Sequence, residues 1–274
     1  MNDSLNEKYA LLEELTNGEF GKIFKAKHKL SHDIVVIKIE EKSKNSLLLY
    51  ETKMYNYLKD YSYISKLRNF YNNNNQFILI IDYHGDTLFN IKDKLNEFNL
   101  ENKINFIGKI CLQLLDAIKC LHDLEFIYRD VKPQNFCFKN VIKVIDLGFC
   151  KQYKINNNHI ENVKLKKIIG TPNYISKNVL ELNTPSRRDD IESIIFIYIF
   201  LLMPNSIWKL YNEMDNYLKK KELLLNEIFI NLNNDFYNNQ LDNKIFKQLL
   251  KNIRKINFQD EPDYNTFKLL IKAI

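Results

Sequence analysis

The order of apolar and polar residues changes along the chain. Between positions 9 and 41, short runs of Val, Ile and Phe are separated by Gly, Asn and His, which predicts strands of an antiparallel meander. The segment 45–60 predicts a helix, and 77–84 predicts a further buried strand. From 101 to 122, and through much of 187–274, apolar residues recur at helical spacing.

This change predicts an α+β protein with two lobes. We expect a small antiparallel β-rich lobe with one main helix over residues 1–84, and a larger, mainly helical lobe over 85–274. The chain would pass from one lobe to the other near Asp82 to Gly85. We find no internal repeat.

Composition places the chain among folded proteins. A hydrophobic content of 45% and an aromatic content of 13% suit a packed core. The longest apolar stretch, 191–204, is too short for an ordinary membrane span and carries Glu192, so it predicts a buried helix. The N-terminal residues lack the basic head and apolar block of a secretory signal. The four cysteines form no C-x-x-C pair, which favours a reducing compartment, cytoplasmic, nuclear or both.

The net charge of +6 is mild for this length, and the lysines are scattered. The one compact run, Lys219 to Lys221, is most simply a solvated helix face; the alternative is an anion-binding or nucleic-acid role. We therefore expect no membrane partner and see no clear signal for nucleic acid.

Two charged residues fall where apolar side chains are expected. Strand alternation puts Lys38 on the same face as Ile34 and Val36. Helical spacing puts Glu51 on the same stripe as Met54. Taken singly, each is more often a side chain whose stem lies along apolar surface or a charge at a helix end. Together they predict an ion pair across a strand–helix contact.

Three other segments carry candidate chemistry. The segment "TNGEFGKIF" (16–24) supplies a glycine-containing turn that could approach a phosphate, although such a turn is usually just a hairpin. The segment "YRDVKPQNF" (128–136) sets an acid, two cations and a carboxamide between apolar runs, as a functional loop does. The apolar strand in "VIKVIDLGF" ends at Asp146, before the pivot Gly148. That arrangement suits a metal ligand or an ordinary strand-end turn.

In this order, and at these spacings, the features resemble the signature set of the protein kinases. The resemblance implies that Asp130 accepts the proton of the substrate hydroxyl and that Lys132 steadies the transferred phosphoryl group. It implies that Asn135 and Asp146 hold Mg²⁺. Pro133 should keep Lys132 extended, so that the loop does not wind into a helix.

The resemblance also implies an ATP site, with both lobes forming one protein kinase domain. Lys38, held by Glu51, would orient the α- and β-phosphates, and Thr171 would help to fix Asp130 and Lys132. The hinge between the lobes would lie against the adenine. The expected nucleotide-binding residues are Asn17, Gly18, Glu19, Phe20, Gly21, Ile23, Lys38, Glu51, Ile81, Asp82, Tyr83 and His84.

The kinase resemblance extends over nearly the whole chain, from about Tyr9 to Ile274, and its finer motifs resemble the casein kinase 1 family. "GTPNYISKN" (170–178) resembles its G-T-A-R-Y-x-S-x-N, "SRRDDIES" (186–193) its S-R-R-D-D-L-E-S, and "INFQDEPDYNTFKLL" (256–270) its closing L-x-F-x-x-x-P-D-Y segment. Lysine two residues after the catalytic acid is the serine/threonine pattern. We therefore expect transfer of the ATP γ-phosphoryl group to Ser and Thr hydroxyls of proteins, with Asp190 supporting the catalytic loop.

The chain also departs from the family pattern. Thr16 replaces the first glycine of the phosphate loop, while Tyr128 and Leu147 replace the usual His and Phe and keep an apolar body in a packing role. Asn173 stands where the family has an arginine that binds a phosphate already on the substrate. We expect weaker dependence on such a phosphate.

Acidic or phosphorylated segments of a protein substrate would meet the cations Arg129 and Lys151. This prediction concerns only the class of peptide, since nothing in the sequence identifies the physiological substrate.

Two alternatives remain at this stage. One is a pseudokinase, an ATP-binding regulatory module, which the loss of glycine at Thr16 favours; the presence of Lys38, Asp130, Asn135 and Asp146 argues against it. The other is a small-molecule kinase with the same fold. It explains the catalytic loop but not the motifs at 170–178 and 186–193.

Overall fold

The computed structural model describes residues 3–18, 21–43, 46–205, 208–209, 211, 216–223 and 243–273. The chain divides into two compact units, one of Met1–Gly85 with Cys137–Phe149 and one of Asp86–Phe136 with Cys150–Ile274. The sequence predicted a single division after residue 84, whereas the chain returns to the first unit for 137–149. Backbone hydrogen bonds explain the return: Ser65 N donates to Val144 O (3.1 Å), and Val144 N donates to Tyr63 O (2.8 Å).

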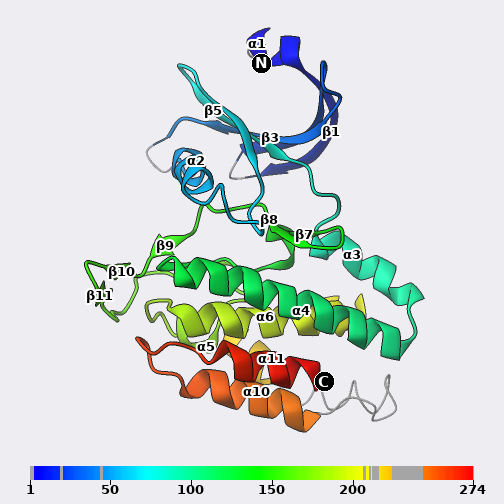
Figure 1. Cartoon of the computed structure of the whole chain (residues 1–274). Coiled ribbons are helices and arrows are strands. Elements are labelled where there is room, and N and C mark those ends of the chain that lie inside the picture. Colours follow the sequence, from blue (N-terminus) through cyan, green and yellow to red (C-terminus); the bar gives the residue numbers. More distant parts are fainter. Residues whose placement is uncertain are drawn as a thin grey trace. The chain divides into compact units, whose positions relative to one another are not determined.

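A five-stranded antiparallel sheet dominates the first unit (Figure 1). Its strand order is β1-β2-β3-β5-β4, so the first three strands form the meander that the sequence predicted. Strand β4 was not predicted. The elements are α1 (Asp3–Lys8), β1 (Tyr9–Gly18), β2 (Gly21–His28), β3 (Ile34–Glu41), α2 (Leu48–Tyr57), β4 (Leu67–Asn72) and β5 (Gln76–Asp82).

Alternation along the central strands builds the core of this unit. Val35 and Ile37 of β3 pack with Ile78 and Ile80 of β5 on one face of the sheet. The opposite face of β3 carries Lys38, as its position in the alternation predicted. Every residue of β5 from Phe77 to Ile81 is buried, which is why this strand reads as a continuous apolar run.

Helix α2 is shorter than the predicted segment 45–60. It begins where the carboxylate of Glu40 accepts hydrogen bonds from Leu47 N (3.2 Å) and Leu48 N (2.9 Å). These are backbone N–H groups at the helix start, which have no partner inside the helix. An acid on β3 therefore fixes the start of α2.

The second unit is mainly helical, as predicted (Figure 1). Helix α4 packs against α6, and α10 and α11 pack against these two. The helices are α3 (Leu88–Lys94), α4 (Leu100–Asp123), α5 (Lys177–Leu180), α6 (Arg187–Leu202), α8 (Tyr217–Leu223), α10 (Asn243–Lys255) and α11 (Tyr264–Lys272), with 3-10 turns η1 (Leu95–Glu97) and η2 (Pro133–Asn135).

Short two-stranded sheets complete the fold. The pairs are β6 (Phe126–Ile127) with β9 (Lys151–Gln152), β7 (Phe136–Phe138) with β8 (Ile142–Val144), and β10 (Lys154–Ile155) with β11 (Asn158–His159). The strand expected to end at Asp146 ends at Val144 instead. Asp146 therefore lies in the segment that follows β8.

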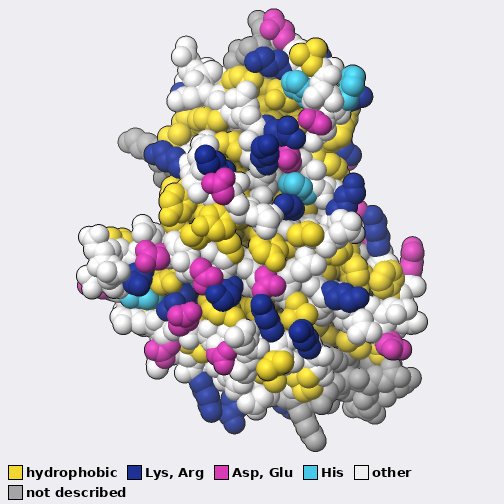
Figure 2. Space-filling model, in the orientation of Figure 1, with side chains coloured by type: hydrophobic (Ala, Val, Ile, Leu, Met, Phe, Trp, Pro, Cys, Tyr) yellow, Lys and Arg dark blue, Asp and Glu magenta, His cyan; other side chains and the backbone are white. Residues whose placement is uncertain are grey.

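Helix α6 contains the apolar run from 191 to 202 and ends two residues before the predicted stretch 191–204 does. Every residue of the helix from Asp189 to Leu202 is buried. A helix covered on all sides needs no polar stripe, so its sequence shows no amphipathic period. Among the helices that the structure describes, none has the length and apolar character required to cross a bilayer. Figure 2 shows positive and negative side chains interspersed over the visible face, which agrees with the mild net charge.

Candidate active site

The predicted ion pair of the first unit is present. Nζ of Lys38 on β3 lies 2.7 Å from Oε1 of Glu51 on α2, and both side chains are buried. Nζ of Lys38 also donates to the carbonyl of Ile145 at 2.8 Å, and Leu147 N donates to Oε1 of Glu51 at 3.4 Å. The pair therefore ties the strand and the helix to the segment that contains Asp146.

Burial and neighbouring charges set the protonation of this pair. Burial raises the pKa of Glu51 to about 7, although the Lys38 ammonium opposes the change. For Lys38, burial disfavours the charge, but the carboxylates of Glu51 and Asp146 outweigh burial and raise its pKa. Lys38 is thus a buried cation at neutral pH, suited to holding a phosphate.

Strand β1 ends at Gly18 and β2 begins at Gly21, and these two glycines are paired. Gly21 has φ +102°, and a Cβ there would lie 2.1 Å from the carbonyl oxygen of Ile39. A larger residue therefore cannot occupy this position without moving β3. Of the residues predicted to bind nucleotide, Ile23 pairs with Lys38 across β2 and β3, whereas Glu19 and Phe20 lie outside the described residues.

The predicted hinge follows directly from β5. Ile81 is buried, and the Asp82 carboxylate accepts a hydrogen bond from Nε of Arg68. The ring Nε2 of His84 lies 2.9 Å from Oγ of Ser65. Burial lowers the pKa of His84. The segment from Ile81 to His84 is thus held in place by contacts with β4 and the residues before it.

In the second unit, three predicted residues surround the buried carboxylate of Asp130, which is itself a predicted site residue. Oδ2 of Asp130 lies 2.7 Å from Nζ of Lys132, and Oδ1 accepts from Oγ1 of Thr171 at 2.8 Å. Nδ2 of Asn135 donates to the Asp130 backbone carbonyl (2.9 Å) and to Oδ2 (3.0 Å). Lys132 is extended, with φ −149° and ψ 156°, as expected before Pro133.

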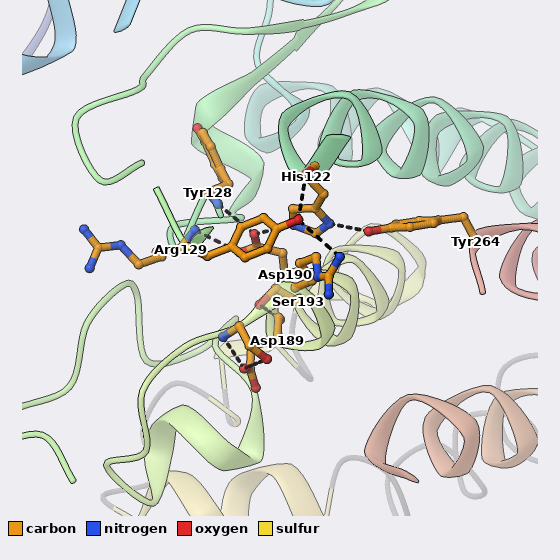
Figure 3. A network of polar contacts seen from close by, with 10 residues as sticks. His122, Tyr128, Arg129, Asp189, Asp190, Ser193 and Tyr264 are labelled. Atoms are coloured by element: carbon orange, nitrogen blue, oxygen red, sulfur yellow. Dashed lines mark hydrogen bonds and ion pairs between the residues drawn. The ribbon is translucent and has the colours of Figure 1, made fainter. Parts of the chain in front are cut away.

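Asp190 of α6 supports this loop, as predicted (Figure 3). Its carboxylate accepts from Tyr128 N at 2.7 Å and from Arg129 N at 2.8 Å. Arg129 has φ +69°, in the left-handed region that non-glycine residues rarely adopt. Gly170 makes room beside it, since a Cβ on Gly170 would lie 2.5 Å from the Arg129 carbonyl oxygen.

Sequence reasoning missed two residues of this network, His122 and Tyr264 (Figure 3). Nε2 of His122 lies 2.9 Å from Oδ2 of Asp190, and Nδ1 lies 2.7 Å from the Tyr264 hydroxyl. His122 closes the apolar run of α4, and Tyr264 belongs to the motif at 256–270. A buried histidine on a helical core face was the available signal, but it does not reveal the partner.

The two substitutions at apolar positions keep their packing role, since Tyr128 and Leu147 are both buried. The solvated-face interpretation of Lys219 to Lys221 was wrong for Lys221. Lys219 is exposed, but Lys221 is buried, donates from Nζ to the Asn173 carbonyl at 3.0 Å and lies 3.2 Å from the Phe196 ring centroid. Successive helix positions point in different directions, so consecutive lysines on α8 do not share one face.

Burial lowers the pKa of Lys221 well below its ordinary value. Its amine supports the backbone at Asn173, so it cannot be treated as a free surface cation. Of the other cations predicted to meet an acidic peptide, Lys151 is exposed on β9 and Arg129 is half-buried.

The donor chemistry fits a hard divalent cation. Asp146 offers carboxylate oxygens, and Asn135, whose amide nitrogen is bonded to Asp130, offers its carbonyl oxygen. Across the described ranges, no three His, Cys, Asp or Glu residues gather as an all-protein metal site. Mg²⁺ in phosphoryl-transfer enzymes is typically bound by one or two protein side chains together with substrate phosphates.

A family model described as the protein kinase domain matches residues 9–265. The chain belongs to the protein kinase family. This match confirms the two-lobed α+β fold class and the kinase resemblance at the level of the whole family. Members of the family transfer a phosphoryl group from ATP to protein substrates with the help of a divalent metal.

Proposed function

We propose that the chain is an active serine/threonine protein kinase of the casein kinase 1 type. It transfers the γ-phosphoryl group of ATP to Ser and Thr hydroxyls of proteins. The arrangement around Asp130 carries the proposal: a buried carboxylate held by Thr171, Lys132 and Asn135. Such positioning is most of what a kinase must supply, because the transition state is loose and needs orientation and charge neutralisation.

Asp130 accepts the proton of the attacking hydroxyl. Thr171 holds one carboxylate oxygen and Asn135 the other, so the orientation of the carboxylate does not depend on the substrate. Lys132 brings a positive charge to the same group and steadies the transferred phosphoryl.

The first unit supplies the nucleotide-binding residues. Lys38 orients the α- and β-phosphates; two of its three ammonium donors go to Glu51 and Ile145. Asn135 and Asp146 would hold Mg²⁺ through their side-chain oxygens, and the ion would supply charge neutralisation for the phosphates of the nucleotide. In this proposal residues 1–84 form the nucleotide-binding lobe, to which the segment 137–149 is added, and the remainder of 85–274 forms the substrate-binding lobe.

Serine/threonine specificity is supported by Lys132, which bonds the catalytic carboxylate. The casein kinase 1 type is supported by the motifs at 170–178, 186–193 and 256–270. Arg129 and exposed Lys151 are the cations that would meet acidic or phosphorylated substrate segments. Asn173 supplies only a neutral amide where the family has an arginine.

The deciding experiment is phosphorylation of casein by the purified chain in ATP with and without Mg²⁺, followed by identification of the modified amino acid. The proposal expects Mg²⁺-dependent phosphoserine or phosphothreonine, and none with Asp130→Asn. A pseudokinase would bind nucleotide without transferring phosphate. A small-molecule kinase would leave casein unmodified and consume ATP only with a small hydroxylated acceptor.

A further inference from the structure

We propose that Tyr264, on helix α11, is a positioning residue for phosphoryl transfer, which acts on the catalytic loop through His122 and Asp190. The inference rests on the proposed function, in which Asp130 takes the proton of the substrate. It assigns a role in catalysis to a side chain that does not touch Asp130.

Asp190 connects the loop 128–136 to His122. Its carboxylate accepts from Tyr128 N (2.7 Å) and Arg129 N (2.8 Å), and Nε2 of His122 lies 2.9 Å from Oδ2 (Figure 3). Both carboxylate oxygens of Asp190 accept from backbone N–H groups, so the side chain acts here as an acceptor and Nε2 of His122 is the donor, which carries a proton. A bare Nε2 would instead place its lone pair against the carboxylate.

The Tyr264 hydroxyl determines the role of the other ring nitrogen of His122, Nδ1. In a neutral imidazole protonated at Nε2, Nδ1 is an acceptor, and the Tyr264 hydroxyl lies 2.7 Å from it. Because Nδ1 is the acceptor in this tautomer, the Tyr264 hydroxyl is the donor. Burial raises the pKa of Tyr264, which favours the phenol that carries this proton. The hydroxyl therefore selects the one neutral tautomer of His122 that can donate to Asp190.

No alternative donor replaces this hydroxyl among the described contacts of Nδ1. Tyr153 also contacts His122, but its hydroxyl donates to the backbone carbonyl of His122 at 3.0 Å and accepts from Nη1 of Arg187 at 3.1 Å. His122 is 2% exposed, so bulk water does not reach the ring. Loss of the Tyr264 hydroxyl would leave a buried acceptor unsatisfied.

The effect reaches the reaction through the backbone of Arg129. Its left-handed conformation (φ +69°) persists only if the surroundings hold it, and Asp190 holds its N–H. Arg129 directly precedes Asp130, so a change in this backbone turns the catalytic carboxylate. Such a change lowers the rate of the chemical step more than it weakens substrate binding.

The test is Tyr264→Phe in the full chain, which removes one oxygen atom and keeps the ring. We expect kcat for a casein-derived peptide to fall about tenfold, the loss expected when a buried acceptor is left without its donor. KM for ATP and for the peptide should stay within about twofold, because the binding residues are unchanged. Spectra of the ¹⁵N-labelled histidines should show His122 protonated at Nε2 in the wild type and a mixture of tautomers in the variant.

Phe267→Leu is the matched control, since Phe267 is buried on the same helix and has no hydrogen-bonding group. It should lower the melting temperature and leave both kcat and the His122 spectrum unchanged. An equal loss of kcat in both variants would mean that α11 acts by packing alone and would overturn the proposal.

A double variant tests whether Tyr264 acts on the reaction through His122. Because Tyr264 acts through His122, adding Tyr264→Phe to His122→Phe should cost no further activity. Additive losses in the double variant would contradict the proposal. Wild-type kcat in Tyr264→Phe would contradict it as well, whichever spectrum His122 then shows. If the wild type phosphorylates no protein, the proposed function fails, and the His122 spectrum alone decides whether Tyr264 sets the tautomer.

Discussion

Thr171 donates its hydroxyl hydrogen to Oδ1 of Asp130 over 2.8 Å, although 41 positions separate the two residues. The contact joins the segment 170–178 to the loop 128–136. It holds one oxygen of the carboxylate while Lys132 and Asn135 hold the other. The carboxylate is thereby oriented before any substrate arrives.

Two replacements of Thr171 distinguish the effect of its hydroxyl on activity from the effect of its side-chain shape. We expect Thr171→Ser to keep at least half of wild-type kcat and Thr171→Val to lose about ten- to hundredfold, because only serine can donate to Asp130. Steady-state kinetics on a casein-derived peptide measure both. Equal activity in the two variants would show that the hydrogen bond has no part in catalysis.

Substitution of Asp130 and of Asp146 should abolish activity for different reasons. Asp130→Asn and Asp146→Asn should each abolish phosphorylation and leave the protein folded, because each removes a charge that the chemistry uses. Asp146→Asn should also weaken Mg²⁺-dependent binding of ATP, whereas Asp130→Asn should not. Calorimetric titration of ATP with and without Mg²⁺ distinguishes them, and wild-type activity in either variant contradicts the assignment.

Lys38 and Glu51 should act as a unit. Lys38→Met should remove most activity, and Glu51→Gln should lower it because Lys38 is no longer held. Since the two side chains meet at 2.7 Å, the double variant should be no slower than Lys38→Met alone. Additive losses of kcat/KM would mean that each residue works independently.

The pKa of Glu51 gives a pH dependence. Because that pKa is about 7, Glu51 gains a proton as the pH falls below neutrality and its ion pair with Lys38 is lost. We expect kcat/KM for ATP in the wild type to fall as the pH drops through 7. In Glu51→Gln, kcat/KM for ATP should not show this fall near pH 7, because the glutamine side chain does not titrate.

The free energy of unfolding should change with pH in the opposite direction to kcat/KM, so that stability rises as the pH falls. The carboxyl pKa is higher in the folded state (about 7) than its ordinary value of 4.5, so the folded state binds the proton more tightly. The contribution of Glu51 is complete below pH 4.5 and is lost as the pH rises to 7, by up to about 3 kcal/mol. Urea unfolding of wild type and Glu51→Gln at both ends of this range measures the difference.

A primed substrate is one that already carries a phosphate. We expect the rate to depend less on priming here than in kinases that have an arginine at the position of Asn173. Hydrogen bonds to charged groups contribute about 1.5 to 3 kcal/mol, which Asn173 cannot supply as a neutral amide. The preference for a phosphorylated peptide over its unphosphorylated twin should be small, and Asn173→Arg should enlarge it, mainly through KM. Lys221 binds the backbone carbonyl of Asn173, so this contact survives the substitution.

Asn173→Gln is the matched control for that experiment, since it lengthens the side chain without adding charge. A hundredfold preference for the primed peptide in the wild type would show that other cations replace the arginine. Exposed Lys151 is the first to test in that case.

The local sequence pattern was sufficient to predict a side chain's direction where residues repeat with the period of a strand or a helix. The alternation of β3 turned Lys38 inward, and the helical spacing of α2 did the same for Glu51. Two buried charges of opposite sign require partners, so the ion pair followed from the sequence. The long, mainly apolar run of α6 likewise predicted a buried helix.

Partners far apart in the sequence depended on tertiary packing. His122 and Tyr264 are 142 positions apart, and periodicity shows that each faces a core but not that they face each other. Of three consecutive lysines, only packing of α8 decides that Lys221 turns inward. The return of residues 137–149 to the first unit arises from hydrogen bonds between Val144 and residues 63–65. A period in the sequence determines the direction of a side chain, whereas its partner depends on the approach of elements distant along the chain.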